Sequence, residues 1–359
     1  MDSEPASNSG FAKFEPWQRA GIVINPLTDD KGLRRLLHLK GGELDRVFDT
    51  VRAMSWQNFG RKIRFYGPSF LHYEVAGFSS DLMSFPSISV TGDRCALNCA
   101  HCGGRILQTM IPATSPERLE EVCGWLKRSG CSGFLLSGGC GADGSVPLGK
   151  FLDSIGRVKR RLNLTVVVHT GIVRGSIAKK LREAGVDAAL IDVVGADETI
   201  RQVLHLDATV EDYERSLEKL ADSGIPLIPH VLVGLHQGMI VGELEALTMI
   251  SRHRPRALVV IVFTPIRGTE MEKVVPPTPD DVARVLVSGR LLLPQVPIAL
   301  GCVRPSGEHR AKTDVLAVKT GVNAIAFPRR EAIDAAGSMG VELSFSRSCC
   351  SQIYKDILG

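Results

Sequence analysis

The sequence contains no apolar run long enough to cross a membrane: its longest, residues 257–263, has seven residues, whereas a spanning helix needs about 20. We expect no secretory leader either, because the beginning, MDSEPASNSG, is acidic and polar with no apolar stretch behind it. A large excess of one charge is also missing, since 43 basic and 39 acidic residues leave a net charge of +4. These absences predict a soluble, cytoplasmic protein with no membrane or nucleic-acid partner.

Cysteine is missing from residues 1–94 but occurs nine times after them. An odd number of cysteines in a chain without signs of secretion argues against a disulfide framework. It favours metal or thiol chemistry instead. The question is which cysteines take part in it.

The composition, 44% apolar and 23% charged over 359 residues, is globular and fits one large α/β barrel or two ordinary domains. From residue 87 on, short β-rich runs alternate with segments of helical period, which predicts βα units and a parallel sheet. Ser115 and Thr278 are expected helix caps, because Pro116 and Pro279 follow them. Eight strands with intervening helices fit a (β/α)₈ TIM-type barrel, complete or partly open, with its active site at the carboxyl ends of the strands. The expected strands are residues 87–91, 133–137, 164–169, 188–194, 227–233, 257–263, 297–301 and 323–327.

Three parts of the chain are expected. Residues 1–85 lack a regular repeat of strand and helix and are interpreted as an N-terminal extension, with helical patches at 31–37 and 44–54. Residues 86–330 form the barrel. Residues 331–359 form a C-terminal segment, whose tail we expect to fold over the barrel mouth.

Directly after the first expected strand stands Cys95-Ala-Leu-Asn-Cys99-Ala-His-Cys102, a CxxxCxxC array. Three thiolates this close together can bind three corners of a cubane iron–sulfur cluster and leave one iron without a protein ligand. A zinc site or three unrelated buried thiols are the alternatives, but zinc sites usually use four ligands in two pairs. No partner pair is obvious nearby.

The array and its place after the first strand resemble the radical SAM superfamily, in particular biotin synthase and lipoyl synthase-like members. The resemblance implies a [4Fe-4S] cluster on Cys95, Cys99 and Cys102, with S-adenosylmethionine on the open iron. It further implies that Ser137-Gly138-Gly139 approaches the methionine amino group, that His101 lies near the adenine, and that Val233-Gly234 contacts the adenine. Glu198 and Arg201 resemble residues that contact the ribose and the methionine carboxylate. A plain turn for the glycines, an exposed loop histidine and a surface Glu198–Arg201 pair stay open.

The remaining cysteines separate into two kinds. Cys123 falls on the apolar face of its expected helix and is interpreted as core, and Cys131 has no evident partner. Cys140 and Cys302 end expected strands, and the Cys349-Cys350 pair lies in the tail. We expect Cys302, Cys349 and Cys350 to hold a second, auxiliary iron–sulfur cluster; that they are unligated is the alternative.

A second cluster is what sulfur-inserting radical SAM enzymes consume, and the pattern most resembles subunits of two-component lipoyl synthases. That resemblance implies a 5′-deoxyadenosyl radical, sulfur insertion into an octanoyl chain on a lipoyl carrier domain, a related partner subunit and a low-potential electron donor. An acidic carrier would be attracted by basic side chains such as Arg304, Arg329 and Arg330. Two alternatives are kept: a biotin synthase-like enzyme that acts on a small molecule without donating sulfur, and a non-catalytic iron–sulfur electron carrier.

Overall fold

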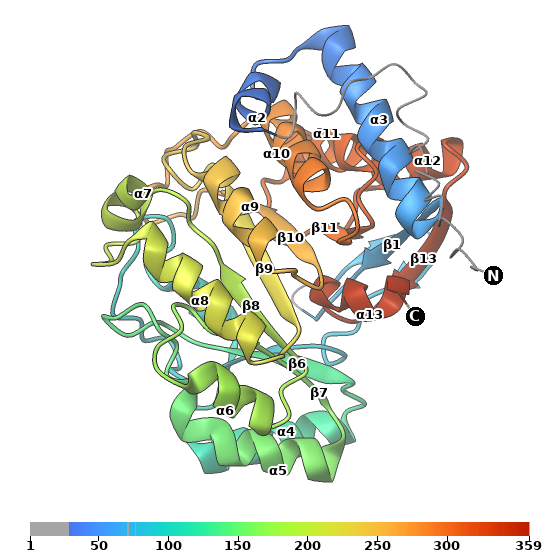
Figure 1. The fold of residues 1–359 in the computed structure, drawn as a ribbon. Helices are drawn as coiled ribbons and strands as arrows, with labels where there is room; N and C mark the ends of the chain where they lie inside the picture. The colour runs from blue at the N-terminus through green and yellow to red at the C-terminus, as the bar shows by residue number, and fades with distance from the viewer. Residues whose placement is uncertain (1–28, 70–71, 76, 359) are drawn as a thin grey trace, which may run out of the picture.

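The structure is a computed structural model and describes residues 29–69, 72–75 and 77–358. It is an α/β fold in which a curved parallel sheet is surrounded by helices (Figure 1). The eight expected strands all occur, and three more join them. In the order in which neighbouring strands pair, the sheet runs β13 (Glu342–Ser346), β1 (Lys62–Tyr66), β12 (Ala324–Ala326), β11 (Ile298–Leu300), β10 (Leu258–Val262), β9 (Leu227–Val233), β8 (Ala188–Asp192), β7 (Thr165–His169), β6 (Gly133–Ser137), β4 (Ser87–Ser89) and β5 (Ile111–Pro112).

The sheet is an open barrel, because β13 and β5 are edge strands rather than neighbours. A separate two-stranded sheet pairs β2 (Glu74–Val75) with β3 (Phe78–Ser79). The predicted TIM-type fold, partly open, is confirmed.

Helices follow most strands and cover the outer face of the sheet (Figure 1). Ser115 caps its helix by accepting a hydrogen bond from the Arg118 amide, and Thr278 forms a capping box with Asp281, as the two prolines predicted. None of the described helices is both long and apolar enough to cross a lipid bilayer. The α-helices are α2 (Asp30–Leu36), α3 (Gly41–Phe59), α4 (Pro116–Arg128), α5 (Leu152–Leu162), α6 (Ile177–Glu183), α7 (Asp197–Gln202), α8 (Val210–Asp222), α9 (Glu243–Arg252), α10 (Pro279–Leu292), α11 (Gly307–Lys319), α12 (Arg330–Ser338) and α13 (Ile353–Leu358). Short 3₁₀ turns are η2 (Arg105–Thr109), η3 (Leu148–Phe151) and η4 (Cys350–Gln352).

The period-2 alternation of the strands separates two apolar cores. In β7, Val166 and Val168 belong to the core beneath the outer helices, whereas Val167 packs with Ala188 and Leu190 in the barrel interior. Apolar residues on both faces explain why the strands appear in the sequence as continuous β-branched runs. The interior is a packed core.

The N-terminal part is more closely joined to the barrel than expected. Helix α3 packs outside, against α10 and α11, but β1 lies inside the sheet, where it pairs with β12 and β13. The boundary expected at residue 85 therefore does not separate an extension from the barrel. Its expected patches at 31–37 and 44–54 are helical, and residues 1–28 lie outside the described residues.

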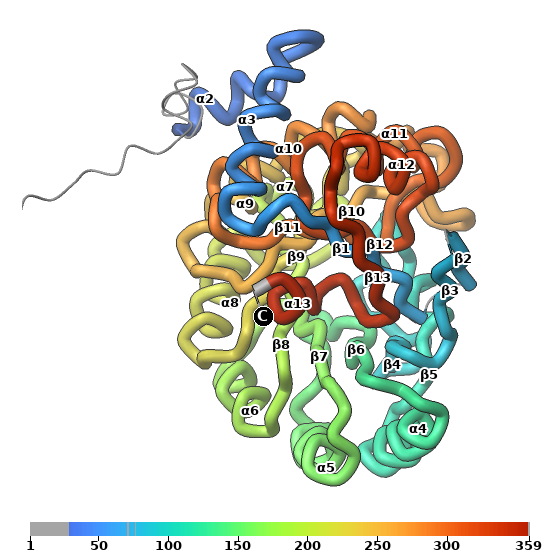
Figure 2. The backbone as a smooth tube through the Cα atoms, turned by 90° about the vertical axis from the view of Figure 1, so that its right-hand side faces the viewer, coloured from blue at the N-terminus to red at the C-terminus, as the bar shows by residue number. Residues whose placement is uncertain are grey.

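The C-terminal segment occupies the barrel interior. Cys349, Cys350, Ile353 and Tyr354 pack among the inward-facing strand residues, and Figure 2 shows α13 within the curve of the strands. The Tyr354 hydroxyl donates to the carbonyl of Asp187, which precedes β8. Cys349 and Cys350 lie beside Cys302, which follows β11, and helix α13 continues from there to the amino ends of the strands, so only the start of the tail lies near the expected mouth. Its apolar side chains bury more surface inside the barrel than they would above its polar rim.

Candidate active site

The cysteine loop begins directly after β4 and is held by backbone hydrogen bonds to distant parts of the barrel. The Ala96 amide donates to the Cys140 carbonyl at 2.8 Å, and the Ala100 amide donates to the Val203 carbonyl at 2.8 Å. Asn98 adopts a positive φ of 45°, which turns the chain between the first two cysteines. The loop is thus fixed to the ends of β6 and α7.

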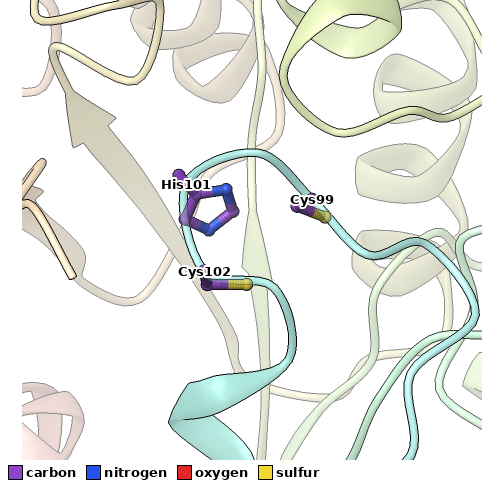
Figure 3. Close-up of side chains that lie close together, drawn as sticks. All are labelled: Cys99, His101 and Cys102. Atoms are coloured by element: carbon purple, nitrogen blue, oxygen red, sulfur yellow. The ribbon is translucent and has the colours of Figure 1, made fainter. Parts of the chain in front are cut away.

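Cys99, His101 and Cys102 come close together on this loop (Figure 3), with one potential ligand atom of each within 4.8 Å of the others. Cys95 is half-buried on the same loop and interacts electrostatically with Cys99. A hydrogen bond from the Cys99 thiol, together with His101, lowers the pKa of Cys102 to about 4. A readily formed thiolate suits this residue to bind a metal cluster.

The His101 ring lies beside Cys102, and its Nδ1 is buried without a hydrogen-bond partner among the described residues. A buried nitrogen without a partner carries a desolvation cost, which a bound group could relieve. This open nitrogen, together with the soft thiol set around it, fits a cluster and its ligand. The expectation of an adenine contact for His101 stays a prediction.

The glycine pair after Ser137 borders the cysteine loop directly. A Cβ at Gly139 would lie 2.6 Å from the Cα of Cys95, so only glycine allows the loop to approach this closely. The Gly139 amide donates to the Thr91 hydroxyl at 2.7 Å. Gly139 is therefore required for packing of the loop, a reason that the sequence pattern did not suggest.

The segment after β9 is organised by Glu243, which sequence reasoning missed. Its carboxylate accepts hydrogen bonds from the amides of Gly234 (2.7 Å), Val241 (2.8 Å) and Gly242 (3.1 Å). Burial raises the pKa of this carboxyl, against the opposite effect of the three amides. Gly234 has a φ of 78° and packs against Pro277, so a side chain there is disfavoured. Glutamate at the start of a helix after a Gly-rich turn is the signal that could have identified it.

A pocket lies next to two of the expected cofactor segments, but none of the residues expected to bind the cofactor lines it. It lies between the ends of β8 and β9 and the start of α7. Thr199 and His236 share a hydrogen bond of 3.1 Å at its wall. The lining residues are Val193, Val194, Gly195, Thr199, Val231, Leu232, Leu235, His236, Gly242 and Glu243.

Glu198 and Arg201 do not form the surface pair that was left open. The Glu198 carboxylate accepts a hydrogen bond from Gln202 at 3.1 Å and lies 4.0 Å from His236, whereas Arg201 is exposed. The roles of both residues toward a cofactor stay predictions, as do those of Ser137, Gly138, Gly139, Val233 and Gly234.

The fold places the three cysteines expected to form a second site in one part of the barrel interior, but their sulfur atoms do not converge as closely as the ligand atoms of Cys99, His101 and Cys102. Cys302 follows β11 and packs against the interior cluster that contains Cys349 and Cys350. Burial raises the pKa of Cys302 to about 11, and Cys349 adds to this effect. Cys350 donates a hydrogen bond to Cys349, which lowers the pKa of Cys349 to about 7. Three thiols separated by almost 50 residues thus share one part of the barrel interior.

Two further cysteines, Cys123 and Cys131, are structural, while Cys140 is half-buried next to the glycine pair. Cys123 is completely buried on its helix, as expected, and the Cys131 thiol donates to the Gly133 carbonyl at 3.1 Å.

The expected basic docking residues include one that is unsuited to that role. Arg304 is completely buried, with Nε 2.6 Å from the Asp314 carboxylate. It joins the segment after β11 to helix α11 and is unavailable to a carrier. Arg329 and Arg330 remain largely exposed.

A family model for the radical SAM superfamily matches residues 89–239, which contain the cysteine loop and strands β6 to β9. This part of the chain is a radical SAM domain. The chain is therefore a radical SAM enzyme whose cofactors are a [4Fe-4S] cluster and S-adenosylmethionine. Of the three loop cysteines expected to bind the cluster, Cys99 and Cys102 converge, whereas Cys95 lies on the same loop outside that close group. Their role as cluster ligands stays a prediction.

Curated relatives of this radical SAM enzyme include two biotin synthases. That of Zymomonas mobilis subsp. mobilis is 24% identical over 247 residues, which cover 66% of this chain and 72% of the relative. That of Leptospira biflexa is 27% identical over 220 residues, 58% of this chain and 60% of the relative.

Solved structures share the fold. Methylornithine synthase (PylB) matches with a TM-score of 0.62 at 17% identity and covers 93% of this chain and 99% of its own. HydG, a maturase of the [FeFe]-hydrogenase, matches with a TM-score of 0.65 at 14% identity, over 95% of this chain and 78% of its own. At these identities the likeness concerns the fold alone.

Proposed function

We propose that this radical SAM enzyme removes a hydrogen atom from a C–H bond of a small, polar molecule bound in the barrel beside the cysteine loop. One observation carries the proposal: the deeper interior is filled by the chain's own C-terminal segment, while polar side chains face the region near the loop. A long acyl chain would need the apolar space that Ile353 and Tyr354 already occupy. The curated relatives, biotin synthases, are named for a small-molecule product and support the same choice.

The residues of the site would have different roles. Cys95, Cys99 and Cys102 would hold the cluster. When bound, the cluster and S-adenosylmethionine together supply a 5′-deoxyadenosyl radical. The tight approach of Gly139 to Cys95 fixes the loop against β6, and Glu243 fixes the turn after β9. A rigid site of this kind orients a substrate. The C-terminal segment in the barrel interior excludes water that would enter from the amino ends of the strands.

The test compares two classes of substrate. Anaerobically reconstituted protein is supplied with S-adenosylmethionine and dithionite, and 5′-deoxyadenosine release is measured by chromatography. One arm adds a deuterated cell extract filtered to below about 1 kDa, and the other adds a deuterated octanoylated carrier peptide. The proposal expects deuterium in 5′-deoxyadenosine only with the small-molecule fraction. Transfer only from the peptide would contradict it.

Sulfur insertion is the second candidate, because Cys302, Cys349 and Cys350 share one part of the interior. These thiols would hold an auxiliary cluster as the sulfur donor, and the substrate would be an octanoyl chain on a lipoyl carrier, with a related radical SAM subunit and a low-potential electron donor as partners. Mass spectrometry of the peptide arm, with and without such a subunit, tests this candidate. A gain of about 32 or 64 Da, from one or two sulfur atoms, would support it. An unchanged mass would contradict it.

A non-catalytic electron carrier would need no nucleotide pocket. Release of 5′-deoxyadenosine from the reduced protein would exclude that alternative.

A further inference from the structure

Three polar side chains from neighbouring strands point into the barrel interior: His169 of β7, Asp192 of β8 and His230 of β9. The register pairs Asp192 directly with His230, and it pairs His169 with Leu190, two residues before Asp192. Residues two apart share one face of a strand. Val167, Leu190 and Ile228, each two residues before one of the three, belong to the interior core. The three polar residues therefore face the interior too, nearer the carboxyl ends.

The ligand atoms of these side chains converge. His169 Nε2 lies 3.3 Å from Asp192 Oδ1, and the two imidazole centroids are 5.8 Å apart at an angle of 60°. One ligand atom of each residue lies within 4.8 Å of the other two. Atoms bound to one metal ion at about 2 Å are roughly 3–4 Å apart, so small rotations would complete such a site.

The hydrogen bond at His230 orients its ring as a ligand. Nδ1 lies 3.1 Å from the Ile228 carbonyl oxygen. Because a carbonyl only accepts, Nδ1 carries the proton and Nε2 presents a lone pair to the interior. Most metal-binding histidines are oriented in this way, through a hydrogen bond from the second ring nitrogen.

The charge of the group also suits a cation. The Asp192 carboxylate places one acidic group beside the two imidazoles, with Oδ1 3.3 Å from His169 Nε2. The Asp192 side chain is 47% exposed, although it points into the barrel. It therefore faces open space.

We propose that His169, Asp192 and His230 bind a divalent transition-metal ion inside the barrel. Two imidazoles and one carboxylate form a donor set that favours ions such as Fe²⁺, Co²⁺ or Zn²⁺ and leaves positions open for a further ligand. His101 and Cys140 also interact electrostatically with Asp192, so the ion lies on the same side of the barrel as the cysteine loop. The site itself needs neither the cluster nor the proposed substrate.

Cobalt binding to the full chain tests this site. In the Cys95→Ala, Cys99→Ala, Cys102→Ala background, which removes the loop thiols, we expect weak visible d–d bands from Co²⁺ bound to nitrogen and oxygen ligands, beside any thiolate charge-transfer band that Cys302, Cys349 and Cys350 contribute. His230→Gln and Asp192→Asn should each weaken binding at least about tenfold. His253→Gln, which alters a histidine paired with Glu214 outside the barrel, is the matched control and should bind normally.

Manganese provides a second measurement if the triple variant folds poorly. Mn²⁺ prefers oxygen and nitrogen to thiolate, so the cluster-loaded wild type can be titrated by following loss of the free-ion EPR signal. Pulsed EPR should then detect ¹⁴N coupling from imidazole, and His230→Gln should reduce it. Absence of stoichiometric binding, or equal affinity in His230→Gln and His253→Gln, would overturn the proposal.

Discussion

The two groups of cysteines in this barrel are built in different ways. Cys95, Cys99 and Cys102 lie within eight residues of one loop, which backbone hydrogen bonds fix to β6 and α7. Cys302, Cys349 and Cys350 come from two distant segments, and only the return of the tail into the barrel brings them together. The first group depends on local sequence, whereas the second depends on the packing of the whole C-terminal part.

The largest expected difference between the groups is in activity. Cys99→Ala should abolish 5′-deoxyadenosine release, because a cubane cannot be held open to a ligand with a thiolate missing. Cys123→Ala, which alters a buried structural thiol, should retain it. The check is chromatography of 5′-deoxyadenosine after anaerobic reconstitution. Release by Cys99→Ala at the wild-type rate would show that the loop is not the cluster site.

The number of iron atoms bound per chain distinguishes the second group of cysteines from the first. The wild type should carry about eight irons per chain after reconstitution, and Cys302→Ala should carry about four while still releasing 5′-deoxyadenosine. Cys131→Ala is the matched control and should leave the iron content unchanged. A wild type that binds only about four irons would remove the case for an auxiliary cluster.

Because the tail lies in the barrel interior, shortening one of its buried side chains should cause a large loss of stability. Ile353 is completely buried among strand residues, so Ile353→Ala should lower the free energy of unfolding by about 3 kcal/mol. Ile357→Ala, at a half-buried position on the same helix, should cost less. Urea denaturation measures both. Equal small effects would mean that the tail does not fill the barrel.

A smaller effect is expected at Glu243. Glu243→Gln replaces a carboxylate that accepts three amide hydrogen bonds with a group that can accept on one side only, and should cost about 2 kcal/mol. Because folding raises the pKa of Glu243, the folded chain binds more protons than the unfolded chain between the two pKa values. The contribution of Glu243 to stability should therefore fall as pH rises through that window.

Urea denaturation at several pH values between about 4 and 8 tests the direction in which the stability contribution of Glu243 changes with pH. The difference between wild type and Glu243→Gln should decrease toward higher pH over the titration window. A difference that grows with pH there would contradict the raised pKa.

Several site residues could have been found from the sequence but were not. His169 ends a predicted strand and Asp192 lies two residues before the end of another, near the carboxyl ends where a barrel places its active site. That position was a usable signal. His230 lies inside its strand and is recognisable only from its register with Asp192. Arg304 resembled a surface charge because its partner, Asp314, is ten residues away on another element.

The sequence by itself determined the eight central strands, the helix caps, the cysteine loop and the superfamily, because each depends on periodicity or spacing over a few residues. Only the tertiary structure decided that β1 and β13 extend the sheet, that the tail fills the interior, and that Cys302 meets Cys349 and Cys350. It also decided that His169, Asp192 and His230 converge. These features depend on strand register and on the competition of apolar segments for the interior, which act between residues far apart in the chain.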